Sequence, residues 1–338
     1  MAERTVFGDI SPRTAAYAAK RLLTRGQHQM LTERFGQSKP IPRKSSSTVK
    51  FRRYESMSRA TAPLAEGITP GGQKLTKTDV TATLQQYGDL VEITDVIQDT
   101  HEDPVLMEAI DICGEQAAET LEVIRVAILR AGSNVFYANG VASRATVNSV
   151  VSAGDLRRVV RYFNRRKAKP ISQIVKASAK ISTEPVAQSY FAMCHTDMKS
   201  DIREIAGFTP VEQYSNSDRS LPGEIGKVEE IRFVCSALIE PFLAAGVAGT
   251  TYLSSGEIVA AATACDVYPI LIVAQDAYGI VPLQGKNSVT PTVLNPDKPS
   301  KSDPLAQRGM VSWKTYHTAC ILNQNWLARV ETACTAKP

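Results

Sequence analysis

The stretch that decides the fold is STVKFRRYE, residues 47–55, with its continuation LTKTDVTATLQQYGDLVEIT, residues 75–94. In the first stretch Val49 and Phe51 alternate with charged residues, and in the second Val80 and Ala82 alternate with threonines. A period of two is typical of a strand with one apolar face. The segment ITPGGQK, residues 68–74, lies between the two stretches, so the sequence predicts a hairpin whose strands are half polar.

This hairpin has little core of its own. A strand of about 12 residues spans ~40 Å, against a radius of gyration near 13 Å for a 100-residue domain. Isolated two-stranded ribbons are marginal in water because they bury too little area to offset the chain entropy. The hairpin therefore either lies on a surface outside itself or forms the edge of an ordinary mixed sheet, and the sequence leaves both interpretations open.

A long amphipathic helix follows in HEDPVLMEAIDICGEQAAETLEVIRVAILRAG, residues 101–132. Asp103 is the expected N-cap, Pro104 the first helical residue, and Gly132 lies just past the end. Such a helix is ~42 Å long and would form a rigid spine. Its expected apolar stripe is Leu106, Ile110, Cys113, Ala117, Leu121, Ile124 and Ile128. Its acidic row is Glu108, Asp111, Glu115, Glu119 and Glu122; with no histidine beside it, the row is expected to be a solvated face rather than a metal or catalytic array.

Beyond Gly140 the pattern changes to alternating helices and strands, which indicates an α/β or α+β region with a substantial core. Residues 152–171 predict a helix rich in arginine, which would contact nucleic acid or an acidic partner, or else be a solvated helix side. Its candidate inner-surface basic residues are Arg157, Arg158, Arg161, Arg165, Arg166 and Lys167. Residues 302–333 predict two closing strands joined as a hairpin.

Charge is distributed unevenly along the 338 residues. Residues 1–60 hold thirteen Lys or Arg against four Asp or Glu, which is +9, so the remainder carries −4 of the net +5. This basic N-terminal extension would contact a polyanion or an acidic neighbour, or be a solvated arm. The segment SKPIPRKSSS, residues 38–47, is expected to be an extended linker rather than a helix or packed strand.

No motif for catalysis or for cofactor or metal binding was found, so the chain is predicted not to be an enzyme and to bind no cofactor or metal. Cys194 and His195 are neighbours that would point to opposite faces of a strand. The six cysteines form no CxxC pair and are expected to be reduced, mostly buried thiols in a cytosol-like compartment. No segment has the ~18 to 20 apolar residues of a membrane helix, and no membrane contact is predicted.

Four long stretches, in the right order, resemble a known family: ERFGQSKPIPRKSSSTVKFRRYE (33–55), TLQQYGDLVEITDVIQDTHEDP (83–104), NVFYANG (134–140) and SDPLAQRGMVSWKTYHTACILNQNWLARVE (302–331). They look like the podophage-type major capsid proteins of tailed bacteriophages, which have the α+β Hong Kong 97-type coat fold. The resemblance implies an N-terminal arm (1–36), an extended E-loop (37–99), a peripheral P domain with the spine helix (100–150) and an axial A domain (151–304). The last strands (305–338) would return to the P domain.

The resemblance also implies a function. Such proteins self-assemble as hexamers and pentamers into an icosahedral shell around double-stranded DNA, in the host cytoplasm, and become the virion capsid. In this family each E-loop lies across a neighbouring copy, so the resemblance implies that the hairpin packs on the surface of another subunit. The candidate contact residues in it are Arg52, Arg53, Tyr54, Gly71, Gly72 and Lys74.

Several partners are implied: a portal protein, a separate scaffolding protein because capsid-like sequence starts early in the chain, and decoration proteins in many such shells. No Lys–Asn cross-linking triad is matched. Two alternatives stay open. One is an encapsulin-like cellular nanocompartment shell, which would package enzymes rather than DNA. The other is a basic DNA-binding protein, which would bind DNA as a monomer with steep salt dependence.

Overall fold

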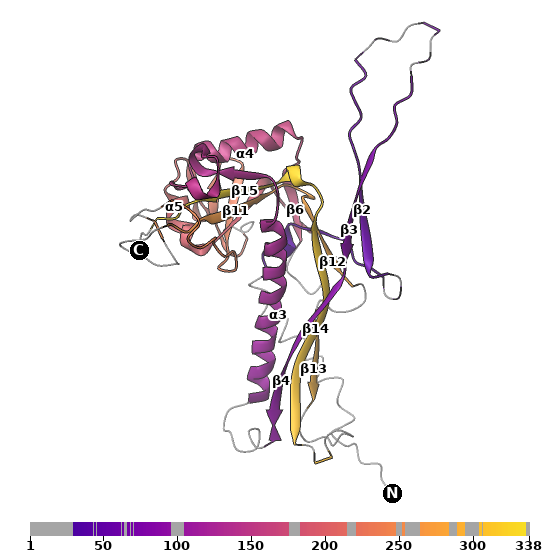
Figure 1. Cartoon of the computed structure of the whole chain (residues 1–338), viewed down its shortest axis with the longest axis vertical. Coiled ribbons are helices and arrows are strands. Elements are labelled where there is room, and N and C mark those ends of the chain that lie inside the picture. Colours follow the sequence, from indigo (N-terminus) through magenta and orange to yellow (C-terminus); the bar gives the residue numbers. More distant parts are fainter. Residues whose placement is uncertain are drawn as a thin grey trace.

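The structure, a computed structural model, is an elongated molecule with a long hairpin, a spine and a globular unit (Figure 1). It describes residues 30–42, 44, 46–61, 63, 66–67, 69, 71–95, 105–175, 183–214, 221–247, 252–253, 264–283, 289–294, 304–305 and 307–335. The predicted helix start at Asp103 and Pro104 and most of the predicted arm, residues 1–29, lie outside the described residues.

The spine is built around one long strand, β14 (Arg308–Ile321). Strand β4 (Gln85–Thr94) pairs antiparallel with it from Arg308↔Thr94 to His317↔Gln85. Strands β12 (Tyr278–Pro282) and β13 (Thr290–Leu294) also pair with β14, and the short β1 (Gln37–Ser38) adds to β12 in parallel. The result is a five-stranded sheet assembled from four distant parts of the sequence.

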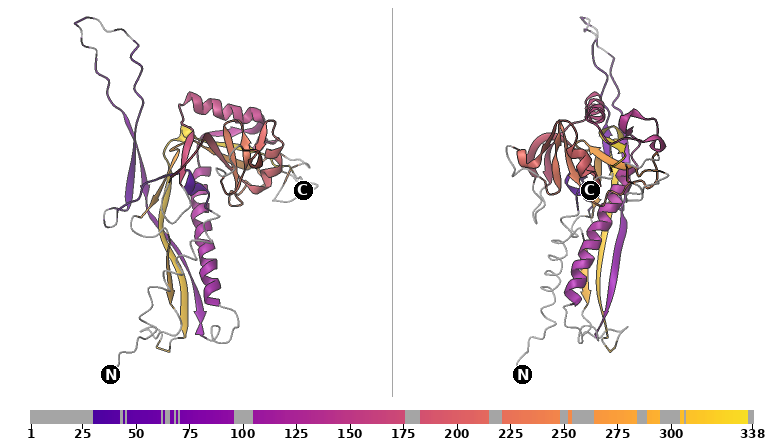
Figure 2. Two further views of the ribbon diagram at one scale, coloured as in Figure 1. Left: turned by 180° about the vertical axis from the view of Figure 1, so that it is seen from behind. Right: turned by 90° about the vertical axis from the view of Figure 1, so that its left-hand side faces the viewer.

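Helix α3 (Val105–Arg130) lies along this sheet, as the two views of Figure 2 show. Its 26 residues span about 39 Å. The core between helix and sheet contains Ile93, Ala109, Ile110, Cys113, Ala117, Leu121, Val289, Val311 and Trp313. The first part of the predicted apolar stripe is thus confirmed.

The second part of that stripe is wrong, because Ile124 and Ile128 are only partly buried while Val126 and Leu129 are buried. The upper end of α3 leaves the sheet and packs Val126 and Leu129 into a core of the globular unit. The buried face therefore rotates around the helix. The described side chains of α3 begin at Met107, so Leu106 is not placed.

The acidic row of α3 is only partly a solvated face. Glu108 is exposed and Glu115 and Glu119 are partly exposed, as expected. The prediction is wrong for Asp111, which is 6% exposed, and for Glu122, which is fully buried. Other segments cover this side of the helix, and no periodicity within the helix could reveal that.

The hairpin consists of β2 (Thr48–Tyr54) and β3 (Lys77–Thr83), which pair antiparallel as a separate two-stranded sheet. The edge-of-a-mixed-sheet alternative is therefore wrong for β2 and β3, but it holds for residues 85–94 of the predicted second stretch, which form β4 of the spine sheet. The strands have seven residues each rather than about 12. Across Leu84, β3 runs on into β4, so one extended segment pairs first with β2 and then with β14.

The globular unit contains an eight-stranded sheet. Its strands, in spatial order, are β5 (Val135–Tyr137), β15 (Leu327–Thr332), β11 (Tyr268–Val273), β7 (Thr183–Cys194), β10 (Ile231–Cys235), β9 (Glu224–Val228) and β8 (Phe208–Pro210), with β6 (Ile171–Val175) on β7. Alternate residues of β7 enter two cores on opposite faces of the sheet. Helices α4 (Ala153–Arg165) and α5 (Lys199–Arg203) contribute to the first core.

The predicted C-terminal hairpin is wrong, because β14 belongs to the spine sheet and β15 to the globular sheet. Burial explains the difference. Residues of β14 alternate between buried and partly exposed, which suits a sheet with one covered face, whereas all six residues of β15 are buried. The short helix η8 (Gln324–Trp326) carries the chain from one sheet to the other.

The α3–sheet core gives a stability prediction. Leu121→Ala should lower the free energy of unfolding of the dissociated subunit by about 2 to 5 kcal/mol, because it leaves a cavity beneath the helix. Ile112→Ala, at a position that is 58% exposed on the same helix, should change it by less than about 0.5 kcal/mol. Chemical denaturation followed by circular dichroism measures both, and equal losses would contradict this packing.

Candidate functional site

The base of the hairpin rests on its own chain. The ring of Phe51 packs against Gly279 of β12 so closely that a Cβ there would lie 2.8 Å from the ring. Phe51 and Ala82 share a small core with Ile41 and Val281. The prediction of an unpacked linker over residues 38–47 is wrong at its start, because Ser38 belongs to β1 and Ile41 bridges to Leu283 and is buried in this core. The inner half of the hairpin is therefore fixed to the spine.

The outer half of the hairpin projects from the rest of the molecule (Figure 1). All described residues from Ser56 to Thr76 are exposed and belong to no strand. Two large apolar side chains of this segment stand in solvent, Met57 at 53% exposure and Leu75 at 62%, and Tyr54 at the end of β2 is 61% exposed. Exposed apolar side chains gathered on a projection mark a surface that contacts another molecule.

The structure places the six candidate contact residues in two groups. Arg52 and Arg53 make contacts within the hairpin: the guanidinium of Arg52 binds both oxygens of Asp79, at 2.9 and 3.2 Å, and Arg53 lies 2.8 Å from Glu55. The Arg52 hydrogen bonds lower the pKa of Asp79. Exposed residues form the second group: Tyr54, Gly71, Gly72 and Lys74. Their role in subunit contact stays a prediction.

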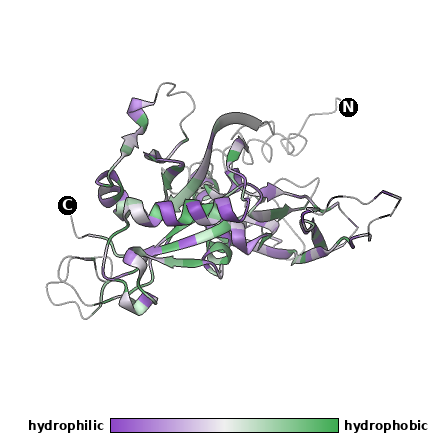
Figure 3. Cartoon of the chain, turned by 90° about the horizontal axis from the view of Figure 1, so that it is seen from above, coloured by the Kyte–Doolittle hydropathy of each residue, from purple (hydrophilic) through white to green (hydrophobic). Residues whose placement is uncertain are grey.

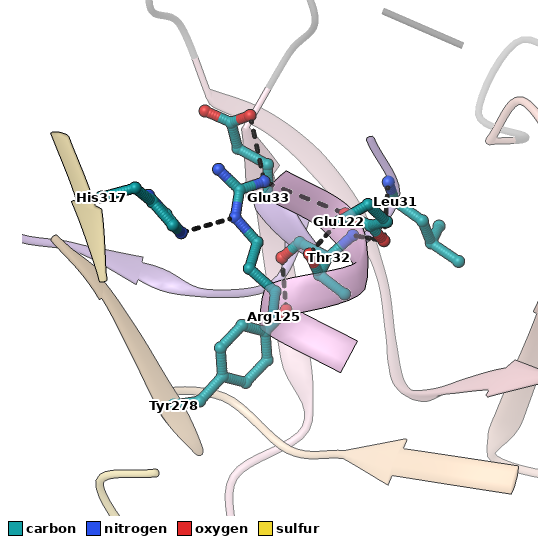
Figure 4. Close-up of polar contacts among 7 residues, drawn as sticks. All are labelled: Leu31, Thr32, Glu33, Glu122, Arg125, Tyr278 and His317. Carbon is teal, nitrogen blue, oxygen red and sulfur yellow. Dashed lines mark hydrogen bonds and ion pairs between the residues drawn. The ribbon is translucent and has the colours of Figure 1, made fainter. Parts of the chain in front are cut away.

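A buried polar cluster lies where the N-terminal segment, the spine helix and the spine sheet meet (Figure 4). We call it the Glu122 cluster; its members are Leu31, Thr32, Glu33, Glu122, Arg125, Tyr278 and His317. One carboxylate oxygen of Glu122 accepts hydrogen bonds from the backbone N–H groups of Leu31 and Thr32, at 3.2 and 2.9 Å. The other accepts from the Thr32 hydroxyl at 2.6 Å.

Arg125 supplies the positive charge of the cluster. Its Nη1 lies 3.5 Å from Glu33 and 3.9 Å from Glu122, and its Nε donates to Nε2 of His317 at 3.1 Å. Burial raises the pKa of Glu122, while Arg125 and the hydrogen bonds from residues 31 and 32 oppose this shift. Burial and the charge of Arg125 lower the pKa of His317 to about 3, so the imidazole is a neutral acceptor.

The Glu122 cluster holds the N-terminal segment in place at residues 31 and 32. The Tyr278 hydroxyl also donates to the backbone carbonyl of Thr32, and burial raises its pKa. Three residues further on, the Phe35 ring stacks on Phe191 of β7 at 4.5 Å. Residues 31–35 thus connect the spine with the globular unit. Sequence reasoning missed this site, because Glu122 looked like one member of a solvated acidic row.

The predicted basic helix is α4, and all six of its candidate basic residues are exposed. Its opposite face buries Leu156, Val159 and Phe163. Two of the arginines are paired, Arg157 with Glu229 at 2.6 Å and Arg158 with Asp155 at 3.5 Å. A shallow groove runs along the helix between Arg157, Arg161, Arg165 and Glu229. In Figure 3, which views the chain from above, hydrophilic residues recur along the helix ribbons.

The described residues hold no arrangement that suggests catalysis or metal binding. Among them, no group of three or more His, Cys, Asp or Glu side chains could hold a metal ion. His195 follows the end of β7 and contacts Asp197 at 3.1 Å, while the buried Cys194 thiol contacts Cys235. Of the helices in the described part of the chain, none is long and apolar enough to cross a membrane.

Comparison with solved structures defines the fold. The capsid of Ralstonia phage GP4 has a TM-score of 0.65 at 9% identity, over 90% of this chain and 88% of that one. The capsid of cyanophage Pam1 has a TM-score of 0.60 at 12% identity, over 87% of each chain. The SrpI encapsulin of Synechococcus elongatus has a TM-score of 0.53 at 10% identity, over 100% of this chain and 98% of that one. The fold is therefore the predicted α+β Hong Kong 97-type coat fold.

The family follows from the sequence itself. The profile of the family described as phage capsid protein matches residues 77–331. The chain belongs to this phage capsid protein family. Among proteins of curated function, no sequence matches it.

The Glu122 cluster gives a pH prediction. The pKa of His317 is near 6.5 in the unfolded chain and about 3 in the folded chain, so protonation favours the unfolded chain. The contribution of the neutral imidazole to stability is therefore complete above pH 6.5 and is lost as the pH falls toward 3. Between pH 6.5 and 5 this loss is about 2 kcal/mol. In His317→Gln, an amide oxygen can still accept from Arg125 without titrating, so the loss should disappear.

The measurement is the free energy of unfolding of the dissociated subunit at several pH values for both proteins. Glu122 acts in the opposite direction, because its raised pKa favours the folded state as pH falls. That contribution is common to both proteins, so their difference isolates the histidine. Parallel pH curves would show that His317 is not buried beside Arg125.

Proposed function

We propose that this chain is the major capsid protein of a tailed bacteriophage and assembles as hexamers and pentamers into an icosahedral shell around double-stranded DNA. The observation that carries the proposal is the outer half of the hairpin. It has exposed apolar side chains and no strand partner among the described residues, yet its base is fixed firmly to the spine. Such a projection is stable when it lies on a second copy of the chain.

The parts of the molecule take roles accordingly. The hairpin, within residues 37–99, is the E-loop, and residues 1–36 form the N-terminal arm, whose root the Glu122 cluster holds. Helix α3 and the five-stranded sheet around β14, which includes β12 and β13, form the P domain. The eight-stranded sheet with α4 and α5 forms the A domain. Strands of both sheets lie across the expected domain boundaries at residues 150 and 304. Strands β5 and β15 belong to the eight-stranded sheet although they lie before residue 150 and after residue 304, and β12 and β13 belong to the spine sheet although they lie between them.

Repeated contacts of moderate size support such a shell. A standard protein interface buries ~1,600 Å² in total, and a subunit surrounded by neighbours makes several of them at once. Exposed apolar residues along the spine provide further surface for neighbours: Leu90 and Val91 on β4, and Ile112 and Val123 on α3. No single contact then needs to be tight.

Other partners complete the proposal. A portal protein, a separate scaffolding protein and decoration proteins belong to the assembly, and the basic face of α4 makes non-specific contact with the packaged DNA. The particle forms in the bacterial cytoplasm. A nanocompartment shell shares the fold, and its particles would contain enzymes instead of DNA.

The hairpin gives the assembly prediction. Deletion of Pro63–Lys74 should leave a soluble, folded subunit that no longer forms shells, because the projection can no longer reach a neighbour. Negative-stain microscopy of the purified protein detects the particles, and circular dichroism confirms the fold. Wild-type protein under the same conditions should give uniform icosahedral particles.

A second variant separates the effect of hairpin length from the effect of its apolar side chains. The triple variant Tyr54→Ser, Met57→Ser and Leu75→Ser keeps the hairpin length and removes its apolar side chains. It should weaken assembly and raise the protein concentration needed for shells. Normal shells from the deletion variant would contradict the assigned role of the hairpin.

The basic helix gives a second prediction. Arg161→Glu should reduce the fraction of DNA-filled particles roughly twofold or more, because it reverses a charge on the face proposed to contact phosphates. Lys314→Glu on the spine sheet makes the same change in net charge and should leave that fraction unchanged. Density-gradient centrifugation separates filled from empty shells. Intact shells of both variants with equal DNA content would exclude α4 from the DNA-facing surface.

A further inference from the structure

Two cysteine thiols touch at the edge of a core in the globular unit. Cys194 is the last residue of β7 and Cys235 the last residue of β10, and the parallel register of these strands places them opposite each other. Their sulfur atoms lie 3.2 Å apart. All six cysteines are free and lie in the described part of the chain, where no other pair of thiols is in contact.

This arrangement is close to that of a disulfide. Neighbouring strands lie ~4.8 Å apart, within the ~4.4 to 6.8 Å that disulfides need between Cα atoms. A sulfur–sulfur bond of ~2.05 Å requires the two atoms to approach by about 1 Å. The backbone N–H of Ser236 donates to the carbonyl of Cys194 at 2.9 Å and holds the two strand ends together at this point.

The two thiols differ in reactivity. Cys194 is fully buried, whereas Cys235 is partly exposed. The hydrogen bond with Cys194 lowers the pKa of Cys235, and the positive charges of Lys199 and Arg203 act in the same direction. The same hydrogen bond, together with burial, raises the pKa of Cys194. An exposed, more acidic thiol beside a buried one is the arrangement in which the first is oxidised and the second resolves it.

We propose that Cys194 and Cys235 form an oxidisable dithiol that hydrogen peroxide converts to a disulfide between β7 and β10. The Cys235 thiolate attacks one oxygen of the peroxide; the O–O bond breaks, and the leaving hydroxide takes up a proton as water. The Cys194 sulfur then attacks the resulting sulfenic acid, an S–S bond forms, and the hydroxyl leaves with the thiol proton as a second water. Two thiols and one peroxide thus give one disulfide and two waters.

The site responds to a change of surroundings. Bacterial cytoplasm keeps such thiols reduced, and the medium outside the cell is oxidising. On the proposed function, in which the protein is made in a bacterial cytoplasm and leaves the cell in a particle, the cross-link would form after release; this timing rests on the proposed function. It would join two strands of the eight-stranded sheet across about 40 intervening residues. This chemistry does not depend on whether the chain forms shells.

The test uses the full chain, purified with reductant, freed of it and treated with hydrogen peroxide. Maleimide labelling under denaturing conditions should show the number of free thiols fall from six to four, with recovery after dithiothreitol. Chymotrypsin cuts after Phe233 and Leu238 and so separates Cys235 from Cys265, which share one tryptic peptide. Mass spectrometry without reduction should then find the Cys194 and Cys235 peptides linked.

Variants identify the pair. Cys235→Ser should abolish the linked peptide, whereas Cys320→Ser, at the other partly exposed cysteine, should leave it unchanged. The wild-type result decides the question alone if a variant fails to fold. The proposal is overturned if all six thiols survive peroxide that fully oxidises glutathione, or if Cys194 pairs instead with the nearby Cys334.

Discussion

The ladder between β4 and β14 is the interaction on which the rest of the structure depends. Over ten residue pairs, from Arg308↔Thr94 to His317↔Gln85, it fixes one extended segment to the longest strand of the molecule. The same segment continues across Leu84 into β3 and pairs with β2. The hairpin is thus a continuation of the spine sheet rather than a loose appendage. Its direction is set by a backbone ladder that cannot slip by one residue without exposing Val311 and Trp313.

Two kinds of contact hold the hairpin base and the N-terminal segment in place. At the base, Gly279 lets Phe51 approach the sheet. At the junction, the Glu122 carboxylate is removed from water and is stabilised by three hydrogen bonds and by Arg125. Burying a charge is unfavourable unless it is paired and hydrogen-bonded, so this cluster forms only when residues 31–33 are correctly seated. It specifies the path of the chain as it approaches the hairpin.

Much of the fold could be predicted from the sequence, and the errors have physical causes. Alternation in 47–55 and in the first half of 75–94 predicted the hairpin, although residues 85–94 belong to the spine sheet. The period of residues 107–121 predicted the first half of the spine helix, because one neighbouring surface dictates each pattern. The second half was wrong where Val126 and Leu129 meet a different unit. The C-terminal strands were wrongly paired because pairing partners lie far away in the chain. Glu122 and the Cys194–Cys235 contact could not be found, since both depend on tertiary packing.

A coat subunit built in this way leaves part of its own surface unsatisfied. The central claim is that the backbone amides of residues 56–61 and 71–76 gain hydrogen-bond partners only from another copy of the chain. Hydrogen exchange of these backbone amides, compared between the dissociated subunit and the assembled particle, tests this most directly. Rapid exchange is expected in the subunit and strong protection in the particle. Protection already present in the isolated subunit, or none in the particle, would contradict it.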